Sequence, residues 1–222
     1  MFKKIFVAIA GLAVAVGSQA QTASFSMTGT VNPASCSISL GGGGLANFGV
    51  STSVAVRAYT QKSGANVHYD MGIKTFTWNV VCTAATPLQL AFSDGKAGSV
   101  LAIDANDAQR FGLVDGVSGA TSIGSYTVTM ATSNTTVDNL PVMGFLSATT
   151  GSALGWNNNY AGAAVPGRAT GFAKNTGQTT PSTLTTASGT MSVNVLLGKA
   201  YADNATTAIT LNGAGSITLQ YL

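Results

Sequence analysis

Apolar side chains stand at every second position in one stretch of the sequence after another, and this alternation constrains the fold more than any other feature. A period of two places successive side chains on opposite faces of a β-strand, so one face of each stretch can be buried. Many short strands of this kind, bounded by turn residues, predict an all-β sandwich. The alternating residues are Phe25, Met27 and Val31; Cys36, Ile38 and Leu40; Phe76, Trp78, Val80 and Cys82; Leu88, Leu90 and Phe92; Tyr126, Val128 and Met130; Met191, Val193, Val195 and Leu197; and Ile217, Leu219 and Tyr221.

The segments between these stretches are predicted as turns and loops. The glycines at 41–44 are expected to form a turn, because neither a Gly-Lys-Ser sequence nor a helix start comes after them. Residues 132–188 are rich in glycine, asparagine, threonine and proline, which predicts long loops with short strands. A helical turn is expected near residues 105–109.

The composition supports strands over helices. All seven acidic residues are aspartate, and the helix-favouring glutamate is absent from the sequence. The formal net charge of the chain is +3. Removal of Lys3 and Lys4 with a cleaved leader would leave eight basic residues against seven acidic ones. A balance this close to neutral gives no electrostatic footprint for nucleic acid or an anionic membrane.

Residues 1–20 have the three parts of a cleavable secretory signal peptide. Lys3 and Lys4 give a positive start, an apolar run extends from Ile5 to Val16, and small residues occupy positions 18 and 20. The alternative is a membrane anchor, but the run is about 12 residues long and a span needs roughly 20. We therefore expect an exported chain that begins near Gln21 and has no membrane span.

Cys36 and Cys82 are the two cysteines, and in an exported chain an even pair predicts a disulfide. Such a bond would close a loop of about 46 residues and would stabilise the fold by roughly 4 kcal/mol in the chain-entropy model. Two free buried thiols are the alternative. A metal site is less favoured because His68 is the single histidine, and we expect neither a metal nor a cofactor.

Three other segments are candidate sites with weaker signals. His68 could act as a catalytic base, but residues 66–70 predict a polar loop with a solvated histidine. Residues 104–107 resemble the opening of a calcium loop but lack the later oxygen ligand and the closing glutamate. Residues 156–160 combine aromatics with amides, as sugar-binding loops do, although an exposed loop with one packed aromatic is the commoner meaning.

Both ends of the expected mature chain carry apolar, strand-forming segments. Termini are usually frayed and polar, so two such ends imply that each pairs with something. The segment from Phe25 through Gly29 to Cys36 resembles the N-terminal extension of chaperone–usher pilus subunits, in which the first cysteine comes seven residues after a glycine. Asn47-Phe48-Gly49 resembles the Phe-Gly motif that comes next in that family, and Cys82 corresponds to its second cysteine.

The C-terminal end carries the rest of the resemblance. Ile217, Leu219 and the penultimate Tyr221 are similar to the alternating last strand of these fimbrial subunits. The segments Arg110–Leu113 and Ile123–Tyr126 resemble those of a branch of fimbrial proteins that has been studied less.

The resemblance implies an incomplete immunoglobulin-like β-sandwich that is completed by a donated strand. It divides the chain into a signal peptide (1–20), a donor-strand extension (21–33) and a pilin domain (34–222). Phe25, Met27, Gly29 and Val31 would fill the groove of a neighbouring subunit. Ile217, Leu219 and Tyr221 would form the groove strand that also binds a chaperone.

The expected function is that of a structural, non-enzymatic subunit of a bacterial surface fimbria. Its implied partners are neighbouring pilin subunits, a periplasmic chaperone and an outer-membrane usher, and its path leads through the periplasm to the cell surface. The alternatives are a fimbrial adhesin or tip subunit that binds a glycan through a loop such as 156–160, and a secreted enzyme that depends on His68.

Overall fold

The chain divides into two units, residues 1–33 and residues 34–222. The computed structural model describes residues 34–64, 66–103, 107–116, 119, 121–149, 156–160 and 162–222, all within the second unit. The predicted signal peptide and the predicted donor residues Phe25, Met27, Gly29 and Val31 therefore lie outside the described residues.

Strand β4 (His68–Asp94) organises the second unit. Its first part pairs with β1 (Cys36–Leu40), β3 (Thr60–Lys62) and β12 (Thr183–Gly198), and its last part pairs with β11 (Arg168–Ala173) and β14 (Gly215–Tyr221). The sequence predicted two strands here, one around Phe76–Cys82 and one around Leu88–Phe92. That prediction was wrong because Thr183 and Leu184 of β12 pair with Pro87 and Thr86, which keeps the chain extended through the bend.

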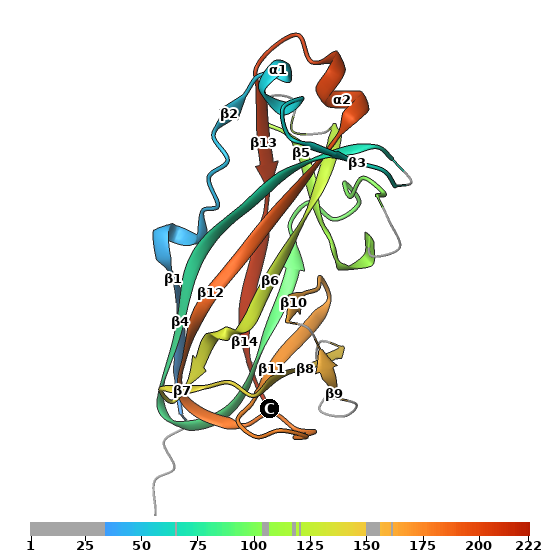
Figure 1. The fold of residues 1–222 in the computed structure, drawn as a ribbon. Coiled ribbons are helices and arrows are strands. Elements are labelled where there is room, and N and C mark those ends of the chain that lie inside the picture. Colours follow the sequence, from blue (N-terminus) through green and yellow to red (C-terminus); the bar gives the residue numbers. More distant parts are fainter. Residues whose placement is uncertain are drawn as a thin grey trace, which may run out of the picture. The chain divides into compact units, whose positions relative to one another are not determined.

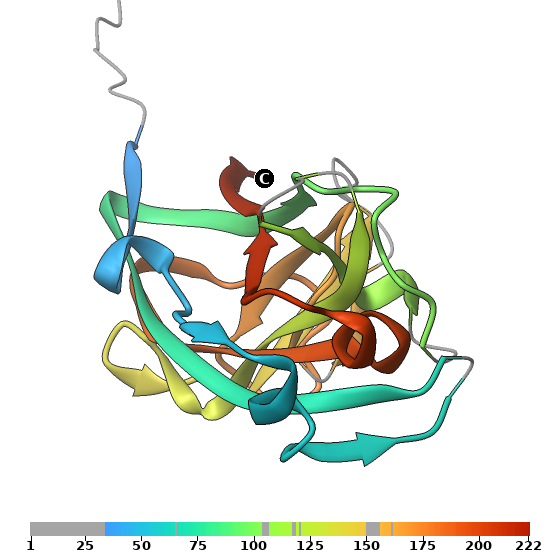
Figure 2. The ribbon, with the colours of Figure 1, turned by 90° about the horizontal axis from the view of Figure 1, so that it is seen from above.

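All the strand pairs are antiparallel, and the main path runs β2-β13-β5-β6-β12-β4-β11-β8-β9. Figure 1 shows these strands, and Figure 2 shows them curling around a common interior. The chain thus has the all-β, sandwich-like fold that the alternation predicted. The other strands are β2 (Val50–Ser51), β5 (Phe111–Asp115), β6 (Ser122–Val137), β7 (Leu140–Pro141), β8 (Gly144–Thr149), β9 (Asn157–Tyr160), β10 (Ala163–Ala164) and β13 (Ile209–Gly213).

The helices in the described residues are short. They are α1 (Ser53–Val56), α2 (Lys199–Asn204) and two 3₁₀ turns, η1 (Gly41–Gly44) and η2 (Asp107–Gln109). The predicted turns at 41–44 and within 105–109 are confirmed where the structure describes them. In the described part of the chain, no helix is long and apolar enough to cross a membrane.

The core forms where the alternating faces of the strands meet. Trp78 and Val80 on β4 are fully buried, whereas Thr77 and Asn79 on either side of Trp78 are exposed. The Trp78 ring stacks on Phe172 of β11 at 5.6 Å between centroids, and Phe172 meets Phe145 of β8 edge-on at 6.2 Å. Burial of each such side chain contributes about 1.5–3 kcal/mol as an upper estimate.

Residues 132–188 contain more regular structure than the sequence predicted. β6 continues to Val137, β12 already begins at Thr183, and β7 to β11 lie between them. Their polar composition suggested loops, but pairing with β6 and β4 satisfies the backbone of these segments.

Candidate binding groove

The C-terminal strands form one side of a groove in the second unit. β13 pairs with β5 through Leu211–Gly213, and β14 pairs with β4 through Gly215–Tyr221. The opposite edge of β13 pairs with β2 at Ile209 and Thr210. From Leu211 onward, the edges of β13 and β14 that face away from β5 and β4 have no strand partner within the described residues.

Residues 45–49, between η1 and β2, form the other side. Their burial alternates as in a strand: Ala46 and Phe48 pack against the core while Leu45 is 69% exposed. No strand of the described chain pairs with this segment. It is therefore a second unpaired backbone edge, and it faces the first one across the groove.

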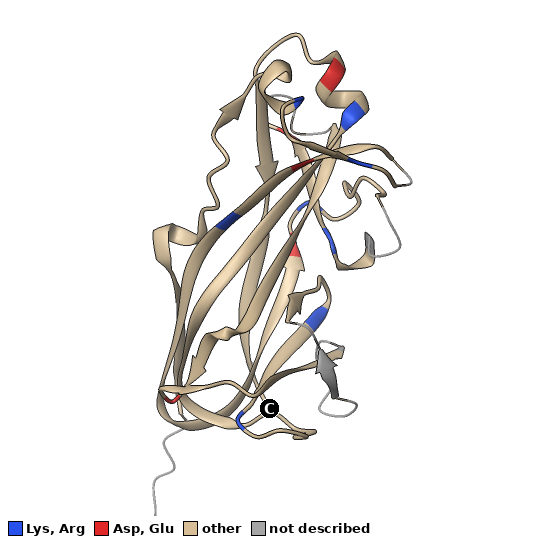
Figure 3. Ribbon diagram, viewed as in Figure 1, with Lys and Arg blue, Asp and Glu red and all other residues tan. Residues whose placement is uncertain are grey.

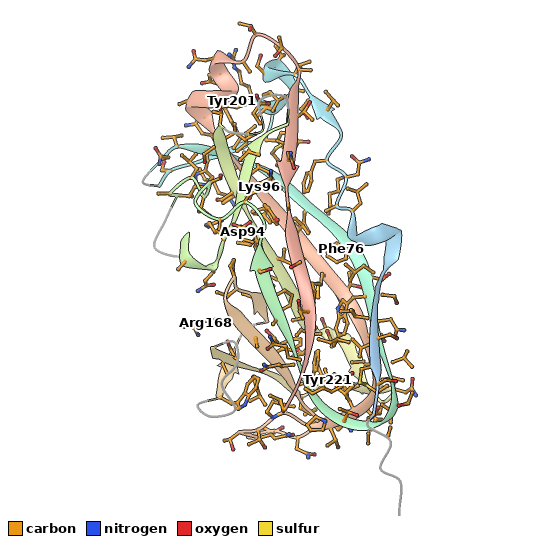
Figure 4. The ribbon with its side chains drawn as sticks, turned by 180° about the vertical axis from the view of Figure 1, so that it is seen from behind. Phe76, Asp94, Lys96, Arg168, Tyr201 and Tyr221 are labelled. Atoms are coloured by element: carbon orange, nitrogen blue, oxygen red, sulfur yellow. A yellow bond between two sulfur atoms is a disulfide. The ribbon has the colours of Figure 1, made fainter. Side chains whose placement is uncertain are left out.

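The floor of the groove is apolar and aromatic. Phe111 of β5 stacks on Tyr126 of β6 at 5.1 Å between ring centroids. Burial, with the nearby Asp94 carboxylate, raises the pKa of the Tyr126 hydroxyl, so this group stays neutral. The space has a volume of about 260 Å³, and Phe76 lies beside it between the two flanks (Figure 4). Phe92, Val128, Val193 and Val195 complete the floor.

Two glycines let the aromatic floor reach the C-terminal strands. A Cβ at Gly213 would lie 2.5 Å from Cε1 of Tyr126, and a Cβ at Gly215 would lie 3.3 Å from Cε1 of Phe111. Distances this short mean that the Tyr126 ring occupies the space a side chain at 213 would need. At 215 the Phe111 ring would have to yield slightly.

Both ends of the groove are closed by contacts between its flanks. At one end the backbone N–H of Cys36 donates to the hydroxyl of Tyr221 at 2.8 Å. At the other end β2 pairs with β13. Between these ends the lining runs from Leu211 to Ile217 along the C-terminal strands, which corresponds to about 20 Å of extended chain. The groove therefore has the length of a strand with about seven residues.

The structure gathers several residues that the sequence singled out. Cys36 and Cys82 form the predicted disulfide, and their pairing in register fixes β1 against β4. Ile217 lines the groove and Leu219 packs against the core, whereas the Tyr221 side chain is half exposed at the end of the groove. Phe48 of the Asn-Phe-Gly motif also lines it.

The sequence did not predict the floor of the groove as a site. Phe111, Tyr126, Gly213 and Gly215 come from three separate parts of the chain, and only the fold brings them together. The available signal was the alternation of Phe111 with Leu113 and of Tyr126 with Val128, which marks buried faces but not a shared site.

The prediction for His68 was wrong. Its side chain is 3% exposed and lies at the start of β4, and Nδ1 is 3.0 Å from the carbonyl oxygen of Asn66. Residue 68 is not in a loop, because Lys62 of β3 and Gly198 of β12 pair with it on its two edges and make it the first residue of β4. A buried histidine bonded to the backbone is not the solvated one we expected.

The other two segments give no support to a ligand site. Residues 104–106 lie outside the described chain, and no group of three or more metal-ligating His, Cys, Asp or Glu side chains occurs among the described residues. The predicted loop at 156–160 is largely strand β9, and the half-buried Trp156 lies over Gly171, 3.2 Å from the position of a Cβ there.

Charge plays little part in the groove. Figure 3 shows few charged residues on the ribbon, with several of them at the end that carries α1 and α2, and the groove lining contains no Lys, Arg or Asp. The lining offers Asn47, Ser216 and the Tyr126 hydroxyl as its main polar side-chain groups. A ligand would therefore be held by burial of apolar side chains and by backbone hydrogen bonds to the two unpaired edges.

The fold and the groove define the class: an all-β, sandwich-like protein with an apolar groove between two backbone edges that are unpaired in the described chain. The chain belongs to the family described as "Protein of unknown function (DUF1120)", whose model matches residues 25–142. No curated protein and no solved structure matches the chain.

Proposed function

We propose that the chain is a structural subunit of a bacterial surface fimbria that polymerises by donating a strand to its neighbour. The observation that carries the proposal is the groove, because an apolar channel between two unpaired edges has the geometry of a sandwich that lacks one strand. An exposed groove of this kind also favours aggregation, which is the physical reason for delivery by a periplasmic chaperone to an outer-membrane usher.

The length and pattern of residues 25–31 suit the groove. These seven residues carry Phe25, Met27 and Val31 on one face, with Gly29 on the same face between Met27 and Val31. The groove lining extends over seven positions, from Leu211 to Ile217. The family match begins at Phe25 and therefore covers residues 25–31 of the proposed donor segment.

The segment that precedes residue 25 fits the same proposal. A signal peptide cleaved near Ala20 would release a short N-terminus that begins at Gln21, four residues before the donor face. The chain would then pass through the periplasm to the cell surface, and the Cys36–Cys82 disulfide suits an oxidising compartment.

A deletion tests the donor segment and the acceptor groove separately. A chain without residues 21–31 keeps the groove, so it should bind a synthetic peptide of residues 21–33 and still engage a chaperone, but it should not form fibres. A Phe25→Asp peptide is the matched control, because it leaves the backbone edge intact while placing a charge in the apolar channel. We expect at least about a tenfold loss of affinity from this change. Fibres formed by the deleted chain, or equal binding of both peptides, would refute the proposal.

A further inference from the structure

The second unit has two ends, and each is built from different elements. The helical end contains α1, α2 and β3 (Figure 1). The disulfide end contains β7, the bend of β4 at residues 83–87 and Tyr221. The C-terminal strands run from the first end, at Ile209, to the second, at Tyr221.

The link between the proposed donor residues and the body of the subunit is short. The backbone N–H of Ser35 donates to Oγ1 of Thr83 at 3.0 Å, and the carbonyl of Ser35 accepts from the N–H of Thr83 at 2.9 Å. The chain is therefore fixed at the disulfide end from Ser35 onward. Only residues 32–34 separate this point from Val31, and four extended steps span at most about 14 Å. A proline at position 33 disfavours a helical conformation for the residue before it, so the sequence predicts a stiff link.

This reach limits how two subunits can be joined. If the donor lies antiparallel to the C-terminal strands, its Val31 enters at the helical end of the acceptor, and the donor's own disulfide end must lie within about 14 Å of that point. Repetition of that step gives an open head-to-tail chain. A parallel donor would instead bring two disulfide ends together and close the assembly at two subunits.

Most of the exposed large apolar residues belong to elements at these same two ends; Leu45 and Ile73 do not. The helical-end patch consists of Val50, Val54, Tyr59 and Val67, and the disulfide-end patch consists of Val81, Leu140, Met143, Tyr221 and Leu222. Two of the most exposed members are Val54 in α1 (74%) and Leu140 in β7 (65%). Several exposed apolar side chains at one end of a molecule are more typical of an interaction surface than single ones scattered over it.

Ion pairs at both ends limit the desolvation penalty of bringing them together. At the helical end Asp203 pairs with Arg57 and Lys199, and Lys62 pairs with Asp70. At the disulfide end Lys174 pairs with Asp138 at 2.6 Å. Paired charges need less desolvation than isolated ones when a second surface approaches.

We propose that the helical-end patch of one subunit packs against the disulfide-end patch of the next. The occupant of each patch is therefore a second copy of this chain, in a heterologous head-to-tail contact that acts in addition to the donated strand. The inference rests on the proposed function, since the short link is what forces the two ends together. The contact needs little affinity of its own, because the link holds the two ends at an effective concentration of the order of millimolar in the fibre.

The test removes strand donation and retains the end-to-end contact. The full chain is refolded with an excess of the synthetic peptide of residues 21–33, so that every groove is filled, and its self-association near 1 mM is measured by sedimentation equilibrium. Val54→Asp and Leu140→Asp should each weaken this association by about tenfold. Ile73→Asp is the matched control, because Ile73 is also exposed (63%) but belongs to neither patch. It should associate like the natural sequence.

A mixture gives the sharpest result. Equal amounts of the Val54→Asp and Leu140→Asp chains retain one intact pair of ends, so they should form dimers and nothing larger. Equal association of all variants, or loss of association with Ile73→Asp as well, would overturn the head-to-tail contact while leaving the proposed function intact. Failure of the peptide to bind the natural sequence would instead remove the proposed function, and this inference with it.

Discussion

Strands β12 and β14 have similar alternating sequences but very different surroundings. β12 pairs with β4 along one edge and with β6 along the other, and its inward side chains are buried in the core. β14 pairs with β4 alone, and in the described chain its second edge faces the groove. The three-strand wall of β4, β12 and β6 carries most of the buried hydrophobic residues of the described chain. The two groove flanks leave apolar surface and backbone groups available for another strand.

The largest expected effect is on the free energy of unfolding, and it should differ between a substitution in the core and one in the groove. Phe172→Ala would leave a cavity between Trp78 and Phe145, and we expect it to lower the free energy of unfolding by about 3–5 kcal/mol. Phe76→Ala removes a ring of the same size that is only half buried in the empty groove, so the loss should be smaller. Urea denaturation of both variants measures the two losses.

For binding of the peptide of residues 21–33, the order of the two substitutions should be reversed. Phe76→Ala should weaken peptide binding by about tenfold, whereas Phe172→Ala should leave the affinity of the folded protein nearly unchanged. If both substitutions destabilised the empty protein equally, the groove would have to be treated as part of the closed core.

A partly exposed electrostatic contact lies beside the wall, just past the end of β6, and its loss should give an intermediate effect. Oδ1 of Asp138 accepts hydrogen bonds from the backbone N–H of Thr185 and Thr186, at 2.8 and 2.9 Å, and Oδ2 pairs with Lys174. Burial alone would raise the pKa of the Asp138 carboxyl, but these hydrogen bonds outweigh it and hold the pKa well below its ordinary value. The ionised form therefore stabilises the fold.

Asp138→Asn should cost about 1–3 kcal/mol at neutral pH. Asparagine tolerates the positive φ of 50° at this position, so the change isolates the charge. Because the folded pKa is lowered, the stabilisation is complete above the unfolded value of about 3.9 and disappears as the pH falls below it. The two unfolding curves should thus converge in acid.

Bound peptide should leave this pH dependence unaltered if the wall and the groove are independent. If Asp138→Asn remained less stable than the natural sequence at low pH, the loss of stability would come from packing and not from the charge. Lys174→Met provides the control and should cost less than Asp138→Asn, because the donors at 185 and 186 remain.

The sequence predicts the wall better than the groove, and the reason is physical. Alternation at Trp78 and Val80 depends on one strand and one buried face, so a local pattern reveals it. The same pattern does not show that β4 continues through its bend, because β12 supplies the pairing from a distant part of the chain. His68 has a similar explanation, since pairing with Lys62 and Gly198 makes residue 68 part of strand β4 and not of a loop.

The groove flanks were predicted only at their ends. Ile217 and the Asn-Phe-Gly motif at 47–49 carry visible signals, whereas the fit of Tyr126 against Gly213 is a property of two distant strands. A glycine in an alternating stretch predicts a bulge or a close approach, but not the partner that approaches.

The smallest expected effect concerns the hydrogen bond that joins the two groove flanks. Tyr221→Phe removes the acceptor of the Cys36 N–H and should lower the stability of the empty protein by about 0.5–1 kcal/mol, since the site is partly exposed. An inserted strand that parts the flanks breaks this bond in the natural sequence as well, so the filled protein should lose nothing. Tyr221→Phe should therefore bind the peptide of residues 21–33 about two- to fivefold more tightly, as measured by isothermal titration. An unchanged affinity would mean that the groove admits a strand without separating β1 from β14, and that the disulfide end is as fixed as the wall.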